Sequence, residues 1–175
     1  TARSRGLGDV YKRQGLLDMT AFAKCRIKGP GAEEFLDNLV ANKLPKKIGR
    51  INLCHALNTK GGVHSEFTIM REAEDSFYLV SAGAFQRLDH DWIHRWMPKD
   101  GSVQFENLTN SNGVLVVSGP KARELMQRVS TDDFSNENFK WLSAKMVDIG
   151  YAPVNAMRVN FVGAVSYTHL RAHET

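Results

Sequence analysis

Cysteine and long apolar runs are both scarce in this sequence. Its 175 residues include two cysteines, Cys25 and Cys54, and the absence of a CxxC motif excludes zinc ribbons and thioredoxin-like redox proteins. We expect both to be free thiols in a reducing compartment. No apolar run approaches the roughly 20 residues of a membrane-spanning helix, so no membrane partner is expected. With 42% hydrophobic and 24% charged residues, the composition is that of an ordinary globular domain.

Excess charge is also missing from the body of the chain. The formal net charge is +4, but residues 1–14 carry +3 and residues 164–175 are neutral, which leaves +1 for the interior. A nearly neutral body provides no long-range field to steer the chain to a nucleic acid. No nucleic-acid partner is therefore expected.

The two ends of the chain differ in character from the residues between them. GLGDVYKRQ near the start and AVSYTHLRAHET at the end resemble translated adapter sequence. The sequence therefore predicts an adapter-like, non-native tail at 1–14, a domain fragment at 15–163, and a second adapter-like tail at 164–175. We expect these tails to contribute few packing contacts.

Alternating apolar patterns predict an α+β fold with an antiparallel sheet. INLCHALN and VHSEFTIM flank a turn that contains Gly61-Gly62, which indicates a β-hairpin over residues 51–70. On an ideal strand, Ile51, Leu53, His55 and Leu57 share one face. Apolar stripes predict helices at 31–44, 83–97 and 120–129. Further strands are predicted at 22–28, 77–82, 103–108, 114–118, 144–149 and 154–162.

One segment of the sequence occurs twice in related form. RIKGPGAEEFL at 26–36 parallels VVSGPKARELM at 116–126, because in each an apolar strand reaches Gly-Pro, then Ala, Glu and an apolar pair. A chance repeat of Gly-Pro, which suits a strand-to-helix corner, is the simpler interpretation. We favour duplication of one αβ unit.

Glu66 lies inside the predicted hairpin, four residues beyond Gly62. Strand alternation places it on one face with His64 and Thr68. It is then either a solvated glutamate or a functional acid, and spacing alone favours the solvated one, because most glutamates are exposed. His64-x-Glu66 lacks the P-C-x-x-C that a zinc deaminase requires, so no metal site is predicted.

Several ordered segments together resemble a known family. They are LLDMTAFAKCRIKGPGAEEFLDNLVAN, LNTKGGVHSEFTI, SFYLVSAGA, SGPKARELM and APVNAMRVNFVG. In that order they are similar to the folate-binding domain of the aminomethyltransferase (T-protein) family, above all to the C-terminal domain of dimethylglycine and sarcosine dehydrogenases. The resemblance covers about 15–163 and implies a truncated T-protein-like fold built from duplicated ferredoxin-like units.

The resemblance also implies a cofactor and the residues that bind it. The family binds tetrahydrofolate, and in the dehydrogenases FAD lies in a separate domain that this sequence does not contain. The family's catalytic carboxylate corresponds to Glu66, and its folate contacts correspond to Phe22, Leu53, Val80 and Phe161. This reverses the preference for a merely solvated Glu66. Two family positions differ here, since Ala82 stands where asparagine is frequent and Ala164 where the family has a pterin-holding glutamate.

The function that the resemblance implies is acceptance of a one-carbon unit by tetrahydrofolate during demethylation of dimethylglycine, sarcosine or a similar amine. Its partners would be folate and the flavin domain of the same parent chain. The alternatives are a stand-alone aminomethyltransferase of glycine cleavage and a folate-binding accessory module for iron–sulfur or tRNA chemistry. We expect a cytoplasmic protein, or a mitochondrial matrix protein if the source is eukaryotic. Because the pterin-holding glutamate after Gly163 and the rest of the fold are missing, we expect the chain alone to bind folate weakly or not at all and to be inactive.

Overall fold

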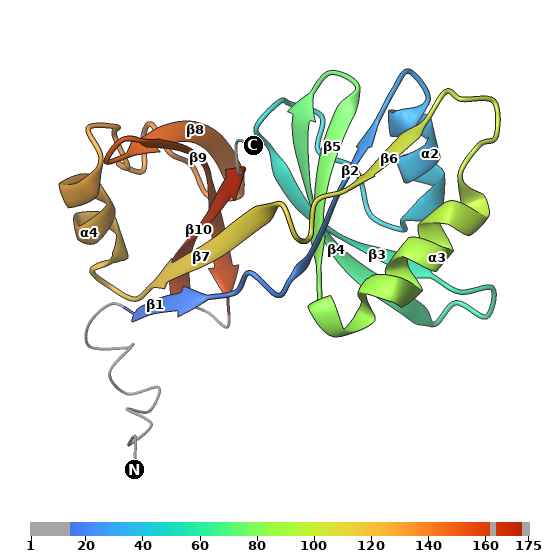
Figure 1. Cartoon of the computed structure of the whole chain (residues 1–175), viewed down its shortest axis with the longest axis horizontal. Helices are drawn as coiled ribbons and strands as arrows, with labels where there is room; N and C mark the ends of the chain where they lie inside the picture. Colours follow the sequence, from blue (N-terminus) through green and yellow to red (C-terminus); the bar gives the residue numbers. More distant parts are fainter. Residues whose placement is uncertain (1–14, 162–163, 173–175) are drawn as a thin grey trace, which may run out of the picture. The chain divides into compact units, whose positions relative to one another are not determined.

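The structure is a computed structural model that describes residues 15–161 and 164–172, with side chains through residue 159. The predicted tail at 1–14 lies outside the described residues. The chain divides into two compact units. We name residues 21–111 the central unit, and residues 15–20 together with 112–172 the flanking unit. Each is described by itself (Figure 1).

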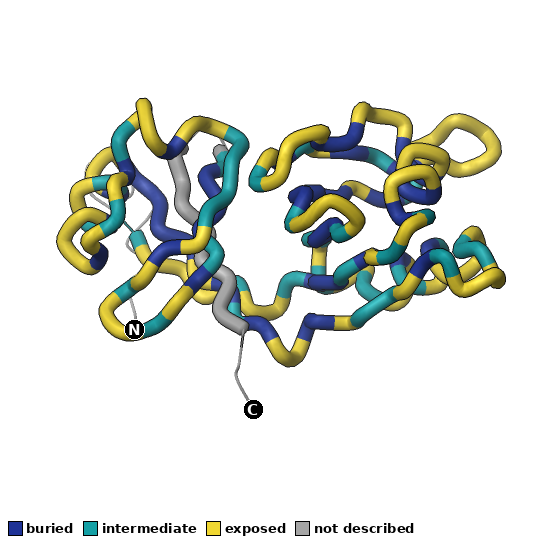
Figure 2. Tube along the Cα trace, turned by 90° about the horizontal axis from the view of Figure 1, so that it is seen from above, coloured by how far each residue is buried: buried dark blue, intermediate teal, exposed yellow. Residues whose placement is uncertain are grey.

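The central unit is a five-stranded antiparallel sheet with helices against one face. Its strands are β2 (Ala23–Lys28), β3 (Ile51–Leu57), β4 (Val63–Ala73), β5 (Ser76–Ser81) and β6 (Gln104–Asn107), in the order β3-β4-β5-β2-β6. Its helices are α2 (Ala32–Leu39), the short 3₁₀ turn η1 (Gly83–Phe85) and α3 (Gln86–Trp96). The core between sheet and helices includes Ile27, Leu36, Phe67, Leu79 and Ile93. Buried and exposed positions are interleaved along the strands, as period-two alternation requires (Figure 2).

The flanking unit repeats this plan. It contains β1 (Gly15–Asp18), β7 (Asn112–Ser118), α4 (Ala122–Val129), β8 (Ser143–Ile149), β9 (Ala152–Phe161) and β10 (Ala164–Ala172). The strand order is β1-β7-β10-β9-β8, again antiparallel throughout. Thus β7-α4-β8-β9-β10 corresponds to β2-α2-β3-β4-β5, and each sheet gains one edge strand, β1 or β6. The predicted duplication of an αβ unit within an α+β fold is confirmed.

The two Gly-Pro corners have the same local geometry. Gly29 and Gly119 adopt φ of 120° and 123°, a region that only glycine tolerates well. Ala32 N donates to Gly29 O at 2.9 Å, and Ala122 N donates to Gly119 O at 3.0 Å. The repeat seen in the sequence is therefore a repeated backbone corner that directs each first strand into its helix.

A buried arginine is repeated as well. Arg71 in β4 and Arg158 in β9 occupy matching register positions, each following a buried methionine. The guanidinium of Arg71 donates to Pro45 O, and that of Arg158 donates to Phe139 O. Each arginine therefore fastens the loop that leads from the helix to the next strand.

Helix α2 is shorter than predicted, ending at Leu39 instead of residue 44. Val40 adopts an extended conformation and forms a β-bridge with Ala56. Ala41 N then donates to His55 O, and the Asn42 amide donates to Leu53 O. Backbone partners on β3 replace the next helical turn, which local sequence periodicity does not reveal.

Strand β10 differs from the expectation that residues 164–175 contribute little to the fold. Its backbone pairs with β9 on one side and with β7 on the other. In the central unit, β5 holds the same place between β4 and β2. The repeated order of elements requires a strand here, because β9 and β7 would otherwise expose unpaired backbone groups. Whether its sequence has an adapter origin is a separate prediction, which this pairing does not address.

Candidate functional site

Most of the predicted site residues meet on the sheet face of the central unit that is turned away from the helices. Cys54, Phe67 and Leu79 belong to the core against the helices, so the residues that alternate with them face the other way. The register places Leu53, Thr68, Val80 and Lys24 in one row across four strands. Leu53 is 44% exposed, which is high for a leucine inside a five-stranded sheet.

Glu66 lies one step along this face, on β4. Its direct cross-strand neighbour is His55 on β3, and His55 Nε2 lies 3.0 Å from Glu66 Oε2. The Glu66 side chain is 61% exposed and the His55 side chain 36%. The contact uses Oε2 alone, so Oε1 has no partner in the part of the chain that the structure describes. The site therefore offers one held and one free carboxylate oxygen.

Phe22 and Val80 are the other two predicted contacts in the central unit. Phe22 is half-buried and directly precedes β2, and Val80 is half-buried on β5. The backbone approaches closely at this point, because a Cβ on Gly83 would lie 1.8 Å from Ala21 O. Glycine is thus required where η1 crosses the start of β2.

Phe161 is the remaining predicted contact. It ends strand β9 of the flanking unit, and its side chain lies outside the described residues. The structure therefore brings Phe22, Leu53, Glu66 and Val80 to one unit, and the placement of Phe161 beside them stays a prediction.

A buried carboxylate on the helix side supports the strands that carry the site. Asp89 of α3 is 1% exposed and accepts hydrogen bonds from the hydroxyls of Ser65 and Ser81, the latter at 2.6 Å. Ser65 precedes Glu66, and Ser81 follows Val80. One helix residue thus fixes the backbone next to both. Burial, reinforced by the negative charge of Asp89, raises the pKa of the Cys25 thiol to about 12.

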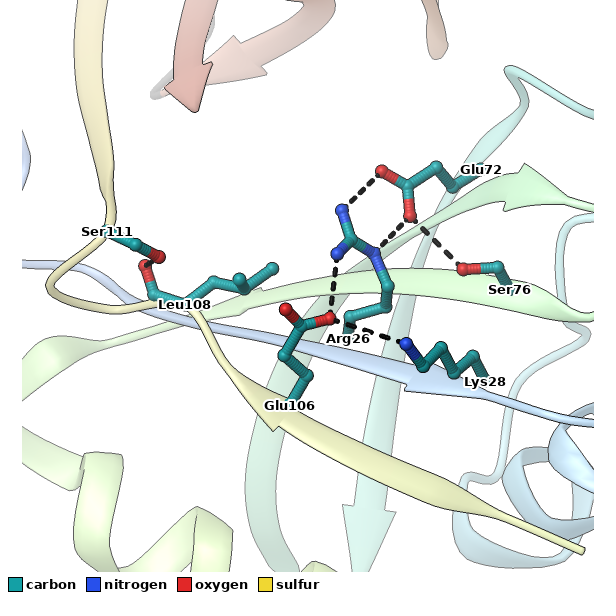
Figure 3. A network of polar contacts seen from close by, with 7 residues as sticks. All are labelled: Arg26, Lys28, Glu72, Ser76, Glu106, Leu108 and Ser111. Carbon is teal, nitrogen blue, oxygen red and sulfur yellow. Dashed lines mark hydrogen bonds and ion pairs between the residues drawn. The ribbon is translucent and has the colours of Figure 1, made fainter. Parts of the chain in front are cut away.

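An ion-pair network holds the neighbouring row on the same face (Figure 3). Arg26 Nε and Nη2 donate to the two carboxylate oxygens of Glu72 at 2.5 and 2.9 Å, and Nη1 donates to Glu106 at 2.8 Å. Ser76 donates to Glu72, and Lys28 lies 4.0 Å from Glu106. The hydrogen bond to Glu72 is the main cause that raises the pKa of Arg26 above its ordinary value. The network joins β2, β4, β5 and β6.

On β3, Leu53 and His55 share one face as expected, opposite to Cys54 and Ala56, which belong to the core. One expectation about side-chain direction is wrong. His64 does not share the face of Glu66, because its ring stacks on Trp92 of α3 at 4.1 Å. A β-bulge between Ala56 and Leu57 breaks the alternation between His64 and Glu66.

His55 is the residue that the sequence analysis missed. It precedes Glu66 by 11 positions, and only the hairpin register makes the two direct neighbours. The available signal was the hairpin itself, which predicts that the two strands are neighbours. The pairing of His55 with Glu66 also depends on the bulge between Ala56 and Leu57.

Other kinds of site find little support. Within residues 15–161 no group of three or more metal-ligating side chains gathers. No helix in the described part of the chain is long and apolar enough to cross a membrane. A hollow of about 270 Å³ between α2, α3 and the β3–β4 turn is lined by Phe35, Leu39, Leu57, Trp92 and Trp96, among others. None of the predicted site residues lines it.

Comparison with known proteins places this geometry in a family. The model of the GCVT N-terminal domain family matches residues 4–170. The chain belongs to this family. The match agrees with the resemblance carried by the ordered segments of the sequence.

Curated relatives of this chain include several enzymes whose names refer to methylated amines. Dimethylglycine dehydrogenase of Rattus norvegicus is 34% identical over 93% of this chain and 20% of its own length. An aminomethyltransferase of Thermoanaerobacter sp. (strain X514) is 31% identical over 74% of this chain and 35% of its own. The chain therefore spans about a fifth of the length of the dehydrogenases it matches.

Solved structures show the same fold. Aminomethyltransferase T from the glycine cleavage system of Bartonella henselae superposes with a TM-score of 0.79 at 18% identity, over 93% of this chain and 43% of that one. Heterotetrameric sarcosine oxidase from Corynebacterium sp. U-96 superposes with a TM-score of 0.70 at 17% identity, over 91% and 75%. At these identities the likeness concerns the fold alone.

Proposed function

We propose that the chain is the part of a tetrahydrofolate-binding domain that carries its reactive carboxylate, and that the domain accepts a one-carbon unit released by demethylation of a methylated amine. Dimethylglycine and sarcosine are the amines that the names of its relatives favour. The observation that carries the proposal is the exposed Glu66 carboxylate, with one free oxygen, beside Leu53 and Val80.

The residues present fit a flat heteroaromatic ligand that bears nitrogen donors. Phe22 and Val80 are half-buried, and Leu53 is an exposed apolar group, so together they offer an apolar surface for a ring. Tetrahydrofolate, when bound, supplies the nitrogen atoms that bond to the one-carbon unit. Glu66 Oε1 can accept a proton from a nitrogen beside it, or place negative charge next to a positive charge that develops there.

A stand-alone aminomethyltransferase is the second candidate. The 31% identity to the Thermoanaerobacter aminomethyltransferase favours it. In both candidates the same carboxylate would serve the same proton transfer, so they differ in the donor of the carbon. The mitochondrial dimethylglycine dehydrogenases among the relatives support a matrix location for a eukaryotic source.

The test uses a chimera of rat dimethylglycine dehydrogenase in which this chain replaces the segment that it matches. In the chimera, Glu66→Gln keeps the shape of the side chain but removes the proton acceptor. We expect folate-coupled transfer to fall by roughly 10²-fold or more, the ordinary size of an acid–base contribution. Amine oxidation should be unchanged, so formaldehyde should accumulate in place of methylene-tetrahydrofolate.

Asp148→Asn is the control, since Asp148 is an exposed carboxylate on β8, the flanking unit's counterpart of β3, at the position that matches His55. It should leave both products unchanged. A wild-type yield of methylene-tetrahydrofolate from the Glu66→Gln chimera would refute the proposal. Glu66 would then be only a solvated glutamate.

A further inference from the structure

The hydrogen bond between His55 and Glu66 has a defined donor and acceptor. An ionised carboxylate oxygen can only accept a hydrogen bond, so the Nε2 atom, 3.0 Å from Oε2, must carry the proton. The second ring nitrogen, Nδ1, has no protein partner among the described residues. Since the ring is about a third exposed, Nδ1 is left to exchange with water.

The His55–Glu66 pair should contribute little to the stability of the fold. Ion pairs between exposed side chains contribute little to folding, because water screens them and two side chains must be ordered. Both partners are exposed on a sheet face whose core lies on the opposite side. The pairing nevertheless selects one carboxylate oxygen and fixes the direction of the other.

The backbone around the pair is also fixed. His55 O accepts from Ala41 N, and Ser65, next to Glu66, donates its hydroxyl to buried Asp89. The β-bulge lies directly beyond the Ala56–Ser65 pair, at the hairpin end of β3. Bulges redirect side chains and are frequent beside active sites. The two side chains therefore meet on strands whose backbones are fixed, β3 by Ala41 and β4 by Asp89.

We infer that His55 is a positioning residue for Glu66: its Nε2–H holds Oε2 so that Oε1 is presented to the reacting nitrogen of the bound ligand. The inference rests on the proposed function for its consequence, but the pairing itself does not. A carboxylate that is free to rotate about its last torsions spends less time in the reactive direction, and misplacement alone lowers rates strongly. The flanking unit has no such pair, because Pro153 occupies the register position of Glu66.

The first experiment tests the pairing on the whole chain without folate. With ¹⁵N-labelled histidine, the His55 imidazole is assigned by its loss in His55→Gln. At alkaline pH, wild type should show the imidazole proton on Nε2 alone. Glu66→Ala should move both nitrogen shifts toward those of a mixture of tautomers. Identical shifts in the two proteins would overturn the inference, whatever the fate of the proposed function.

The second experiment tests the consequence in the dimethylglycine dehydrogenase chimera. His55→Leu should lower the rate of methylene-tetrahydrofolate formation about tenfold, with little change in KM for folate. His55→Gln, whose amide can still donate, should restore most of the rate. In a Glu66→Gln background, His55→Leu should cause no further loss, because the two residues act as one unit.

The outcomes separate the two proposals. A wild-type rate for His55→Leu, or a further loss in the Glu66→Gln background, would overturn the positioning role. A Glu66→Gln chimera with the wild-type rate would overturn the proposed function instead, and the tautomer measurement would still decide whether the pair exists.

Discussion

The two units share one order of elements but differ where their first hairpins reach solvent. In both, a Gly-Pro corner joins strand to helix and a buried arginine fastens the following loop. The central unit then carries His55 opposite Glu66, whereas the flanking unit carries Asp148 opposite Pro153. The corner and the arginine are therefore needed by the fold, and the paired histidine and glutamate are not.

This comparison separates residues that the fold requires from residues that can be changed without unfolding the chain. A feature present in both units serves the common frame, and a feature present in one serves something else. Leu53 and its counterpart Met146 show the same contrast. Both are exposed apolar residues, but only Leu53 lies near a histidine paired with a glutamate. Three sets of measurements test which features the common frame requires, in order of decreasing expected effect.

The largest effect should come from the two buried arginines. Arg71→Met and Arg158→Met each remove the donor to a loop carbonyl and should each destabilise their own unit by about 2 kcal/mol. Arg71 should cost more, because it also pairs with Glu33 at 2.7 Å and lies over the Phe77 ring. Hydrogen exchange measured by mass spectrometry reports each unit through its own peptides. An Arg158→Met protein with unchanged exchange would show that the arginines are not equivalent parts of one frame.

A smaller effect is expected where the units use different residues for the same backbone conformation. Gly49 and Leu142 occupy matching positions, with φ of 77° and 54°, and each donates its N–H to the carbonyl of the buried arginine. Left-handed backbone costs a residue with a side chain about 1 kcal/mol or more. Gly49→Ala should therefore destabilise the central unit by about 1 kcal/mol in urea unfolding.

The control for this prediction is the reverse change. Leu142→Gly relieves the strained backbone but loses the packing of a half-buried leucine, so it should be close to neutral. A strongly destabilising Leu142→Gly together with a neutral Gly49→Ala would contradict the matching of the two positions.

The smallest effect is a dependence on pH of the loop that Arg71 fastens. Arg71 pairs with the Glu33 carboxylate, and this hydrogen bond holds the pKa of Glu33 below its ordinary value. A lowered folded-state pKa gives stability that is present above the unfolded pKa and is lost as pH falls through the folded one. Arg158 pairs instead with the neutral amide of Asn136. Exchange protection of the loop at 45–50 should therefore weaken between pH 5 and 3, roughly the range in which a carboxylate titrates.

Glu33→Gln is the matched variant for this measurement. It should lower the protection of the 45–50 loop slightly at neutral pH and remove most of its response to acid. An unchanged acid response of the 45–50 loop in Glu33→Gln would show that the Arg71–Glu33 pair is not its cause. The loop at 136–142 is no reference here, because Asn138 donates to Asp133, whose pKa is also lowered.

Much of the frame could be predicted from the sequence, because its signals are local. The Gly-Pro corners and the hairpin at 51–70 each follow from a few adjacent residues, and both appear in the structure. Met70-Arg71 and Met157-Arg158 are a further repeat that the sequence contains. It was missed because a lone dipeptide gains meaning only from its register in the sheet.

The parts that could not be predicted depend on contacts between distant residues. Helix α2 ends early because β3 supplies partners for Val40 and Ala41. His64 turns toward Trp92 because of a bulge that no periodicity reveals. Glu66 was found through family resemblance, whereas its partner His55 required the strand register.

The central claim is that the open sheet face of the central unit carries the folate contacts Phe22, Leu53, Glu66 and Val80. A tetrahydrofolate titration of the whole chain, followed by ¹⁵N NMR, tests it most directly. We expect affinity weaker than about 1 µM, so the titration is carried to millimolar ligand. The account predicts that the backbone amides of Phe22, Leu53, Glu66 and Val80 shift together with ligand. The amides of Asn112 and Met146, which match Phe22 and Leu53, and that of Asp148, which matches His55, should stay unchanged. Equal shifts in the two sets, or shifts confined to the flanking unit, would contradict it.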